Sequence, residues 1–262
     1  MGSFRLANDY WQEYTKNVKQ CYLSSTNGHA GVQDISESFE AISIAFRGAK
    51  DLQNFCKEHG IEQDIAIRTA WVLVLGRYTD LEEVCFCVHD RRRGDTLSGI
   101  CRMNINPGDT LTAMLARVQE DAVKSSYFHI DLLQETLSTV GGFRLPEVCN
   151  SAVVQIRGQS HDTALEPTGY DIAVCIANST GLFIQYQPST VSSALTLRIA
   201  QTFEKTLSSI LFAEIGSLLG DLEMLSDSQE KQIAEWNSTS IESVPCLVLE
   251  MVEKQAGHEN SG

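Results

Sequence analysis

Residues 63–78 predict a helix that is apolar around most of its surface. Apolar side chains recur there at three- and four-residue steps and form one continuous face. They are Ile67, Ala70, Trp71, Val74 and Leu75. Such a helix is stable in water only when other elements cover it. The chain must therefore fold into a layered domain in which this helix is largely buried.

Further helices and strands alternate along the chain. Helical spacing of apolar residues predicts helices over 8–23, 51–59, 110–127 and 191–212. Short apolar or alternating runs predict strands over 39–46, 84–88, 152–156, 170–176 and 182–186. We therefore expect an α/β fold, a single lobe in which helices cover a mixed β-sheet.

The connections carry their own signals. Gly60 is the expected C-cap of the helix over 51–59, and Asp109 the expected N-cap of the helix over 110–127. The charged residues 90–95 predict a turn, and residues 178–181 suit a hairpin. Residues 228–236 predict a small helix, followed by a polar stretch over 237–243.

The composition argues against several classes of protein. Hydrophobic residues make up 43% and charged residues 21%, as in a globular protein. A net charge of −14 argues against nucleic acid or an anionic membrane as partner. The longest apolar stretch, about 70–75, is too short to span a bilayer, and the N-terminus lacks the apolar segment of a secretory signal. Several of the eight cysteines lie in apolar runs, so we expect free thiols and a cytoplasmic location.

Four stretches together carry a family resemblance. They are Asp9-Tyr10-Trp11, Ala70–Thr79 with Glu83–Val88, His129–Leu132, and Leu222–Ser226 with Trp236–Thr239. Their order and spacing resemble the condensation domain of nonribosomal peptide synthetases, which has two lobes related to chloramphenicol acetyltransferase. The fourth stretch is similar to the linker that joins a condensation domain to the adenylation domain downstream. Residues 247–256 resemble the first helix of that adenylation domain.

The resemblance implies three parts. They are a condensation-like C-terminal lobe over 1–220, a linker over 221–245, and the cut start of an adenylation domain over 246–262. Only eight residues precede Asp9, so we expect the first lobe of the family to be missing. The crossover after Gly99, which bridges the two lobes in the family, looks shortened.

The catalytic motif of the family has no counterpart here. That motif, His-His-x-x-x-Asp-Gly, supplies the general base, which must lie within hydrogen-bond reach of the proton that it removes. No two of the six histidines are adjacent, and none has an aspartate four residues later. We therefore predict no catalytic residue.

Two histidine-containing segments admit a catalytic interpretation that we do not favour. Ser160-His161-Asp162 has the residue types of a hydrolase triad, but immediate neighbours cannot align in those roles, so a surface turn is expected. His129 with Asp131 could act as a base with its orienting carboxylate; a structural role in the lobe is the preferred interpretation.

Two further motifs could hold a metal or a phosphate. Cys85 and Cys87 lie on one face of a predicted strand, but no second ligand pair with metal spacing accompanies them, so a buried core strand is expected. Residues Arg91–Arg93 could bind the phosphate of phosphopantetheine, although a solvated turn is preferred. We predict no metal and no cofactor site in this chain; the parent synthetase is expected to use phosphopantetheine and ATP with Mg²⁺.

The predicted functional residues are anchors of the linker: Leu222, Leu225, Trp236 and Asn237. The favoured hypothesis is a non-catalytic condensation lobe that supports the adenylation domain of the same chain. Two alternatives stay open: half of a condensation enzyme completed by a separate chain, and a module that docks a carrier protein.

Overall fold

The computed structural model describes residues 9–19, 21–23, 38–92, 95–127, 149–156, 170–177, 181–214 and 216–238. It forms two compact units, Met1–Met224 and Leu225–Gly262, which are treated separately below. The first unit contains a six-stranded sheet, and the second contains one described helix.

The sheet is mixed, with strand order β1-β6-β5-β4-β2-β3. The strands are β1 (Glu40–Ser43), β2 (Glu83–Arg92), β3 (Asp95–Asn104), β4 (Ser151–Ile156), β5 (Ile172–Ala177) and β6 (Gly181–Tyr186). The central strands β2, β4 and β5 are parallel, and the other neighbours are antiparallel. The expected α/β class with a mixed sheet is confirmed.

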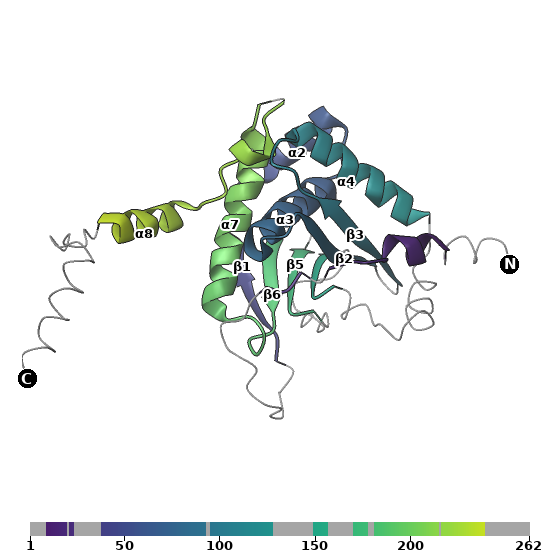
Figure 1. The fold of residues 1–262 in the computed structure, drawn as a ribbon, viewed down its shortest axis with the longest axis horizontal. Coiled ribbons are helices and arrows are strands. Elements are labelled where there is room, and N and C mark those ends of the chain that lie inside the picture. The colour runs from purple at the N-terminus through teal and green to yellow at the C-terminus, as the bar shows by residue number, and fades with distance from the viewer. Residues whose placement is uncertain are drawn as a thin grey trace, which may run out of the picture. The chain divides into compact units, whose positions relative to one another are not determined.

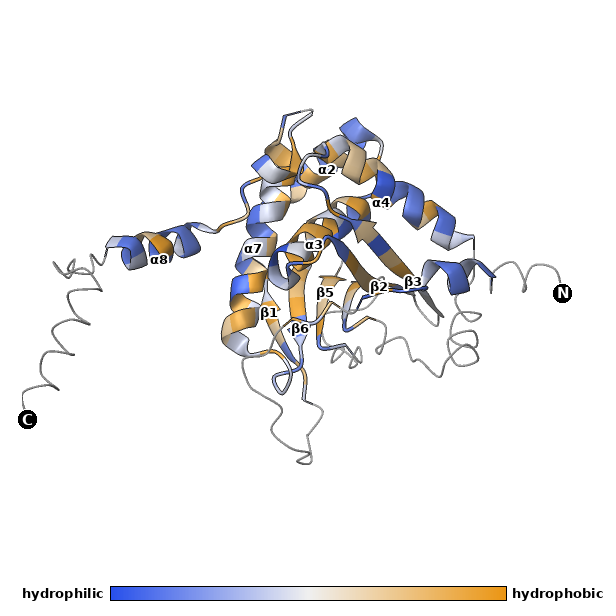
Figure 2. Cartoon of the chain, in the orientation of Figure 1, coloured by the Kyte–Doolittle hydropathy of each residue, from blue (hydrophilic) through white to orange (hydrophobic). Residues whose placement is uncertain are grey.

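Four helices pack together (Figure 1). They are α2 (Ala49–His59), α3 (Gln63–Thr79), α4 (Leu111–Ser126) and α7 (Ser193–Phe212). Three of them, α3, α4 and α7, pack against this sheet. The central helix α3 contacts the other three helices and the strands β2 and β4. Figure 2 shows most of α3 in the hydrophobic colour, between α4 and α7.

The burial of α3 confirms the prediction for residues 63–78. Ten of its residues are buried, and its centre is an edge-to-face contact between Trp71 and Phe203 of α7, with ring centroids 6.2 Å apart. Two fully buried aromatic side chains in such contact contribute strongly to a core. Gly60, with φ of 64°, ends α2 as expected.

Three local predictions are wrong. Residues 9–14 are helical, but the helix predicted over 8–23 ends early, because Asn17 takes a left-handed conformation with φ of 57°. The turn predicted over 90–95 is too wide: β2 runs to Arg92, and β3, a strand that periodicity did not reveal, begins at Asp95 and pairs with β2 antiparallel. An edge strand such as β3 tolerates polar residues, so it lacks the apolar pattern of a central strand.

The third error concerns the cap of α4. Thr110, not Asp109, is its N-cap: the Thr110 hydroxyl accepts a hydrogen bond from the backbone N–H of Ala113 at 3.2 Å. Asp109 instead accepts from Arg117 at 2.6 Å and from the side chain of Asn106 at 3.2 Å.

Candidate functional site

The segment that leaves the sheet domain is bound along its length to the rest of the first unit. We call residues 217–224 the linker segment; it contains the short 3₁₀ helix η1 (Leu219–Asp221). Its backbone pairs with the residues before α4: Leu219 N–H donates to Asp109 O, and Gly220 N–H donates to Pro107 O, both at 2.9 Å. The N–H of Leu111 donates to Ser217 O, also at 2.9 Å.

Side chains of α7 hold the other end of the linker segment. The Ser209 hydroxyl donates to the carbonyl of Glu223 at 2.6 Å, and Lys205 Nζ lies 2.8 Å from the Glu223 carboxylate. The hydrogen bond from Lys205 lowers the pKa of Glu223. Leu219 is buried, and Leu222 and Met224 pack against the hydrophobic core.

The predicted anchors fall in both units. Leu222 belongs to the linker segment of the first unit, whereas Leu225, Trp236 and Asn237 belong to the second. In that second unit, α8 (Asp227–Ser238) begins with a capping box. The Ser226 hydroxyl accepts from the backbone N–H of Gln229 at 3.3 Å, and the Gln229 side-chain oxygen accepts from the backbone N–H of Ser226 at 2.8 Å. Trp236 on α8 is 66% exposed.

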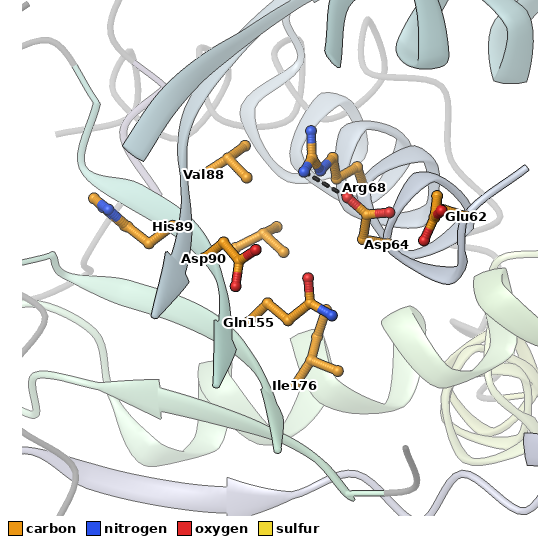
Figure 3. Close-up of a pocket in the computed structure, with 9 residues that line it drawn as sticks. Glu62, Asp64, Arg68, Val88, His89, Asp90, Gln155 and Ile176 are labelled. Carbon is orange, nitrogen blue, oxygen red and sulfur yellow. Dashed lines mark ion pairs between the residues drawn. The ribbon is translucent and has the colours of Figure 1, made fainter. Parts of the chain in front are cut away.

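A polar pocket lies between the N-terminal part of α3 and the sheet (Figure 3). It has a volume of about 360 Å³. Its lining comes from α3 and the residue before it and from the three parallel strands: Glu62, Asp64, Arg68, Val88, His89, Asp90, Val153, Gln155 and Ile176. We call these nine residues the polar pocket. Ligands of α/β proteins commonly bind beside the carboxyl ends of parallel strands.

The pairing register of strands β2, β4 and β5 explains which side chains form the floor of the pocket. Asp90, Gln155 and Ile176 are direct neighbours across β2, β4 and β5, so their side chains project in one row. Opposite this row, Asp64 and Arg68 form an ion pair at 2.5 Å, one helical turn apart on α3. Both side chains are only 17% exposed.

His89 alternates to the other face of β2 from its neighbours Val88 and Asp90. Its Nδ1 lies 2.8 Å from the hydroxyl of Ser98, and its Nε2 lies 2.9 Å from the hydroxyl of Tyr170. Both ring nitrogens are therefore engaged within the domain. His89 is a lining residue that the sequence did not single out; its position in β2, beside an apolar run, was the only available signal.

A second buried polar cluster ties residues 9–16 to the sheet and α4. The Tyr14 hydroxyl donates to Asp121 at 2.7 Å and accepts from the backbone N–H of Arg102 at 2.8 Å. Arg102 in turn pairs with Glu83 through two nitrogens, at 2.9 and 3.0 Å. Burial raises the pKa of the Asp121 carboxyl to about 6, although the hydrogen bond from Tyr14 opposes that rise.

The thiols of the predicted core strand are buried. Cys85 Sγ lies 3.4 Å from Cys149 Sγ, and both are free cysteines. Hydrogen bonds of the Cys149 thiol with Cys85 and Cys87, together with burial, raise the pKa of Cys149. Among the described residues, no group of three potential ligands could hold a metal ion.

Several candidate residues lie outside the described part of the chain. These are His129 with Asp131, Ser160-His161-Asp162, Arg93 and residues 246–262. Arg91 and Arg92 belong to the backbone of β2, opposite Thr96 and Asp95 of β3. None of the helices that are described is long and apolar enough to cross a membrane.

Comparison with known proteins gives a consistent result. No protein-family profile matches the chain. Nonribosomal peptide synthetase 4 of Gibberella zeae is 28% identical over 275 residues, covering 95% of this chain but 4% of that synthetase. The D-lysergyl-peptide-synthetase subunit 1 of Epichloe festucae var. lolii is 24% identical over 266 residues, covering 90% of this chain and 7% of that protein. The chain thus spans a small part of these relatives.

Solved structures share the fold. The X-domain from teicoplanin biosynthesis, in its complex with OxyB, has a TM-score of 0.69 at 15% identity; 86% of this chain and 56% of that chain align. A four-domain nonribosomal peptide synthetase bound to AMP and glycine has a TM-score of 0.69 at 13% identity, covering 86% of this chain and 20% of that one. The first condensation domain of the CDA synthetase has a TM-score of 0.59 at 12% identity, covering 86% and 54%.

The fold is thus that of the chloramphenicol-acetyltransferase-like class of domains. Over at least 90% of its length, the chain is also similar in sequence to fungal peptide synthetases. The chain thus has the fold of the condensation domains of these synthetases and is similar in sequence to fungal nonribosomal peptide synthetases.

Proposed function

We propose that this chain is a non-catalytic condensation-domain element that supports an adenylation domain downstream in a nonribosomal peptide synthetase. The observation that carries the proposal is the binding of the linker segment to the sheet domain. Backbone hydrogen bonds at Leu219 and Gly220 and the side-chain contacts of Glu223 fix the point from which the chain continues. A linker fixed in this way can hold the next domain at a defined place.

The adenylation domain gives a physical reason for a synthetase to retain such a non-catalytic element. An adenylation domain that normally packs against a condensation domain exposes an apolar patch when that neighbour is absent. Exposed patches of this kind lower solubility. The sheet domain, with Leu225 and Trp236 as further anchors, would cover the patch.

His89 supports a non-catalytic role, because both of its ring nitrogens are engaged within the domain. A general base needs a nitrogen directed at its substrate. We assign no phosphopantetheine, ATP or Mg²⁺ site to this chain; these would belong to carrier and adenylation domains of the parent synthetase, in the cytoplasm.

A second function is favoured by one comparison. The X-domain that shares this fold was solved in complex with a separate protein, OxyB. A condensation-type fold can therefore serve as a docking surface for another protein. By analogy, this chain would recruit a carrier protein or an enzyme rather than support its own adenylation domain.

The catalytic question has a direct test. The purified chain is mixed with two carrier proteins that bear aminoacyl thioesters, and the dipeptidyl product is measured by mass spectrometry. We expect no product above the reaction of the loaded carriers alone. Product formed by the chain alone would overturn the non-catalytic assignment. Product that appears only with an added upstream lobe would instead favour an enzyme completed by a second chain.

A further inference from the structure

Three thiols that the proposed function does not use meet in the core of the sheet. Cys85 and Cys87 lie on one face of β2, and Cys149 lies just before β4, the strand that pairs with β2 in parallel. The Sγ atoms of Cys85 and Cys149 are 3.4 Å apart, although 64 positions separate the two residues in sequence. The Cys149 thiol also interacts with Cys87.

The surroundings of these thiols limit what can react with them. Each of the three residues is at most 2% exposed, and all three are free cysteines. Hydrogen bonds with Cys85 and Cys87, together with burial, hold the pKa of Cys149 well above its usual range. Thiolates are therefore scarce and large reagents are excluded, so the site admits only a small oxidant and reacts slowly.

The contact between Cys85 and Cys149 favours one product of oxidation. The sulfur–sulfur bond of a disulfide is about 2.05 Å long, so the two Sγ atoms must approach by about 1.4 Å. Cys21 is placed differently, because its Sγ accepts the backbone N–H of Cys85 at 3.1 Å. We propose that Cys85 and Cys149 form an intramolecular disulfide when the folded chain meets hydrogen peroxide.

The reaction consumes one peroxide for each disulfide. The thiolate of one cysteine attacks a peroxide oxygen, the O–O bond breaks, and the cysteine becomes a sulfenic acid while the departing hydroxide takes up a proton to give water. The thiolate of the other cysteine then attacks the sulfenic sulfur, and the second oxygen leaves as water. The two thiols together lose two electrons, and the peroxide is reduced to two molecules of water.

The disulfide would change the stability of the domain. It would join β2 to the residue before β4 and close a loop that contains β3 and α4. Such a cross-link restricts the unfolded chain, and the restriction grows with the length of the loop. For a loop of this length we expect the melting temperature to rise by about 10 °C.

The test exposes the intact folded chain to hydrogen peroxide. The remaining thiols are alkylated in denaturant, and peptide mass mapping identifies the linked cysteines. We expect a single link, between Cys85 and Cys149, which dithiothreitol reverses, and a higher melting temperature in the linked chain. A link of Cys149 to Cys87, a link between other cysteines, oxidation to sulfinic acid without a link, or unreacted thiols would overturn the proposal.

Two variants make the test specific. Cys149→Ser should lose both the link and the rise in melting temperature. Cys56→Ser is the control: burial and the carboxylates of Asp64 and Glu62 raise the pKa of Cys56 to about 11, and no thiol contributes to that rise. This variant should keep the link and the rise, and loss of either would contradict the assignment. If Cys149→Ser does not fold, the mapped link in the unmodified sequence decides the question.

Discussion

The hydroxyl of Tyr14 and the carboxylate of Asp121, 107 residues apart in sequence, form a hydrogen bond of 2.7 Å. The same hydroxyl accepts the backbone N–H of Arg102, so one oxygen joins residues 9–16, β3 and α4. The segment that contains Asp9-Tyr10-Trp11 is therefore an integral part of the domain.

Tyr14→Phe should destabilise the chain by about 2 kcal/mol, because it removes one hydrogen bond from the buried carboxylate of Asp121 and the acceptor of the backbone N–H of Arg102. Urea denaturation followed by circular dichroism measures the change. Tyr127→Phe is the control, because Tyr127 is 75% exposed, and it should change stability by less than about 0.5 kcal/mol. Equal effects of the two substitutions would contradict the assigned role of Tyr14.

Asp121→Asn should remove a specific dependence of stability on pH. Burial raises the pKa of Asp121 from 3.8 to about 6, so the folded state binds this proton more tightly than the unfolded state. The contribution of Asp121 to stability is therefore greatest at low pH and falls as pH rises from about 4 to about 6, by about 3 kcal/mol in total.

The measurement is the difference in unfolding free energy between wild type and Asp121→Asn at several pH values. Subtraction removes the other titrating groups, including Tyr14, Cys101, Arg68 and Lys124, which face Asp121 in both proteins. We expect wild type to lose stability relative to the variant from pH 4 to pH 7. A constant difference, or one of opposite sign, would refute the raised pKa.

Gly220→Ala should loosen the linker segment. A Cβ at this position would lie 3.3 Å from both the Cβ and the carbonyl oxygen of Pro107, closer than ordinary contact. We expect the amide hydrogens of Leu219 and residue 220 to exchange about fivefold to tenfold faster. Gly108→Ala is the matched control, because its nearest neighbour, Asn106 Oδ1, would lie 3.5 Å away. Unchanged exchange in Gly220→Ala would show that this contact does not hold the segment.

Thr110→Ala should cost about 1 kcal/mol, since it removes the N-cap hydrogen bond of α4. Asp109→Asn keeps that cap and weakens the contacts of Asp109 with Arg117 and Asn106, which are partly exposed, so a smaller loss is expected. Thermal denaturation of both variants compares them. A larger loss of stability in Asp109→Asn than in Thr110→Ala would indicate that Asp109, the residue predicted from the sequence, is the N-cap of α4.

Much of the fold could be predicted, because burial leaves a periodic pattern. The helix over 63–78 and the strands over 152–156 and 182–186 are regular elements whose inward faces are apolar. The helix over 8–23 could not be bounded, because a single left-handed residue, Asn17, ends it. The edge strand β3 was missed because one of its sides needs no apolar partner.

The polar pocket could not be predicted, because it depends on register between distant strands. Asp90 and Gln155 are 65 positions apart and become neighbours only through the parallel pairing of β2 with β4. Likewise, nothing in the sequence showed that Glu223 would be held by Lys205 and Ser209 of α7. The resemblance predicted a linker over 221–245, but it did not predict the contacts of residues 217–224.

The most direct test of the central claim uses the proposed parent synthetase of this chain. The intact enzyme is compared with a form that lacks residues 1–224, in soluble yield and in amino-acid-dependent ATP–pyrophosphate exchange. We predict that the shortened enzyme is less soluble or less active in adenylation. Unchanged yield together with unchanged exchange would contradict a supporting role for this domain.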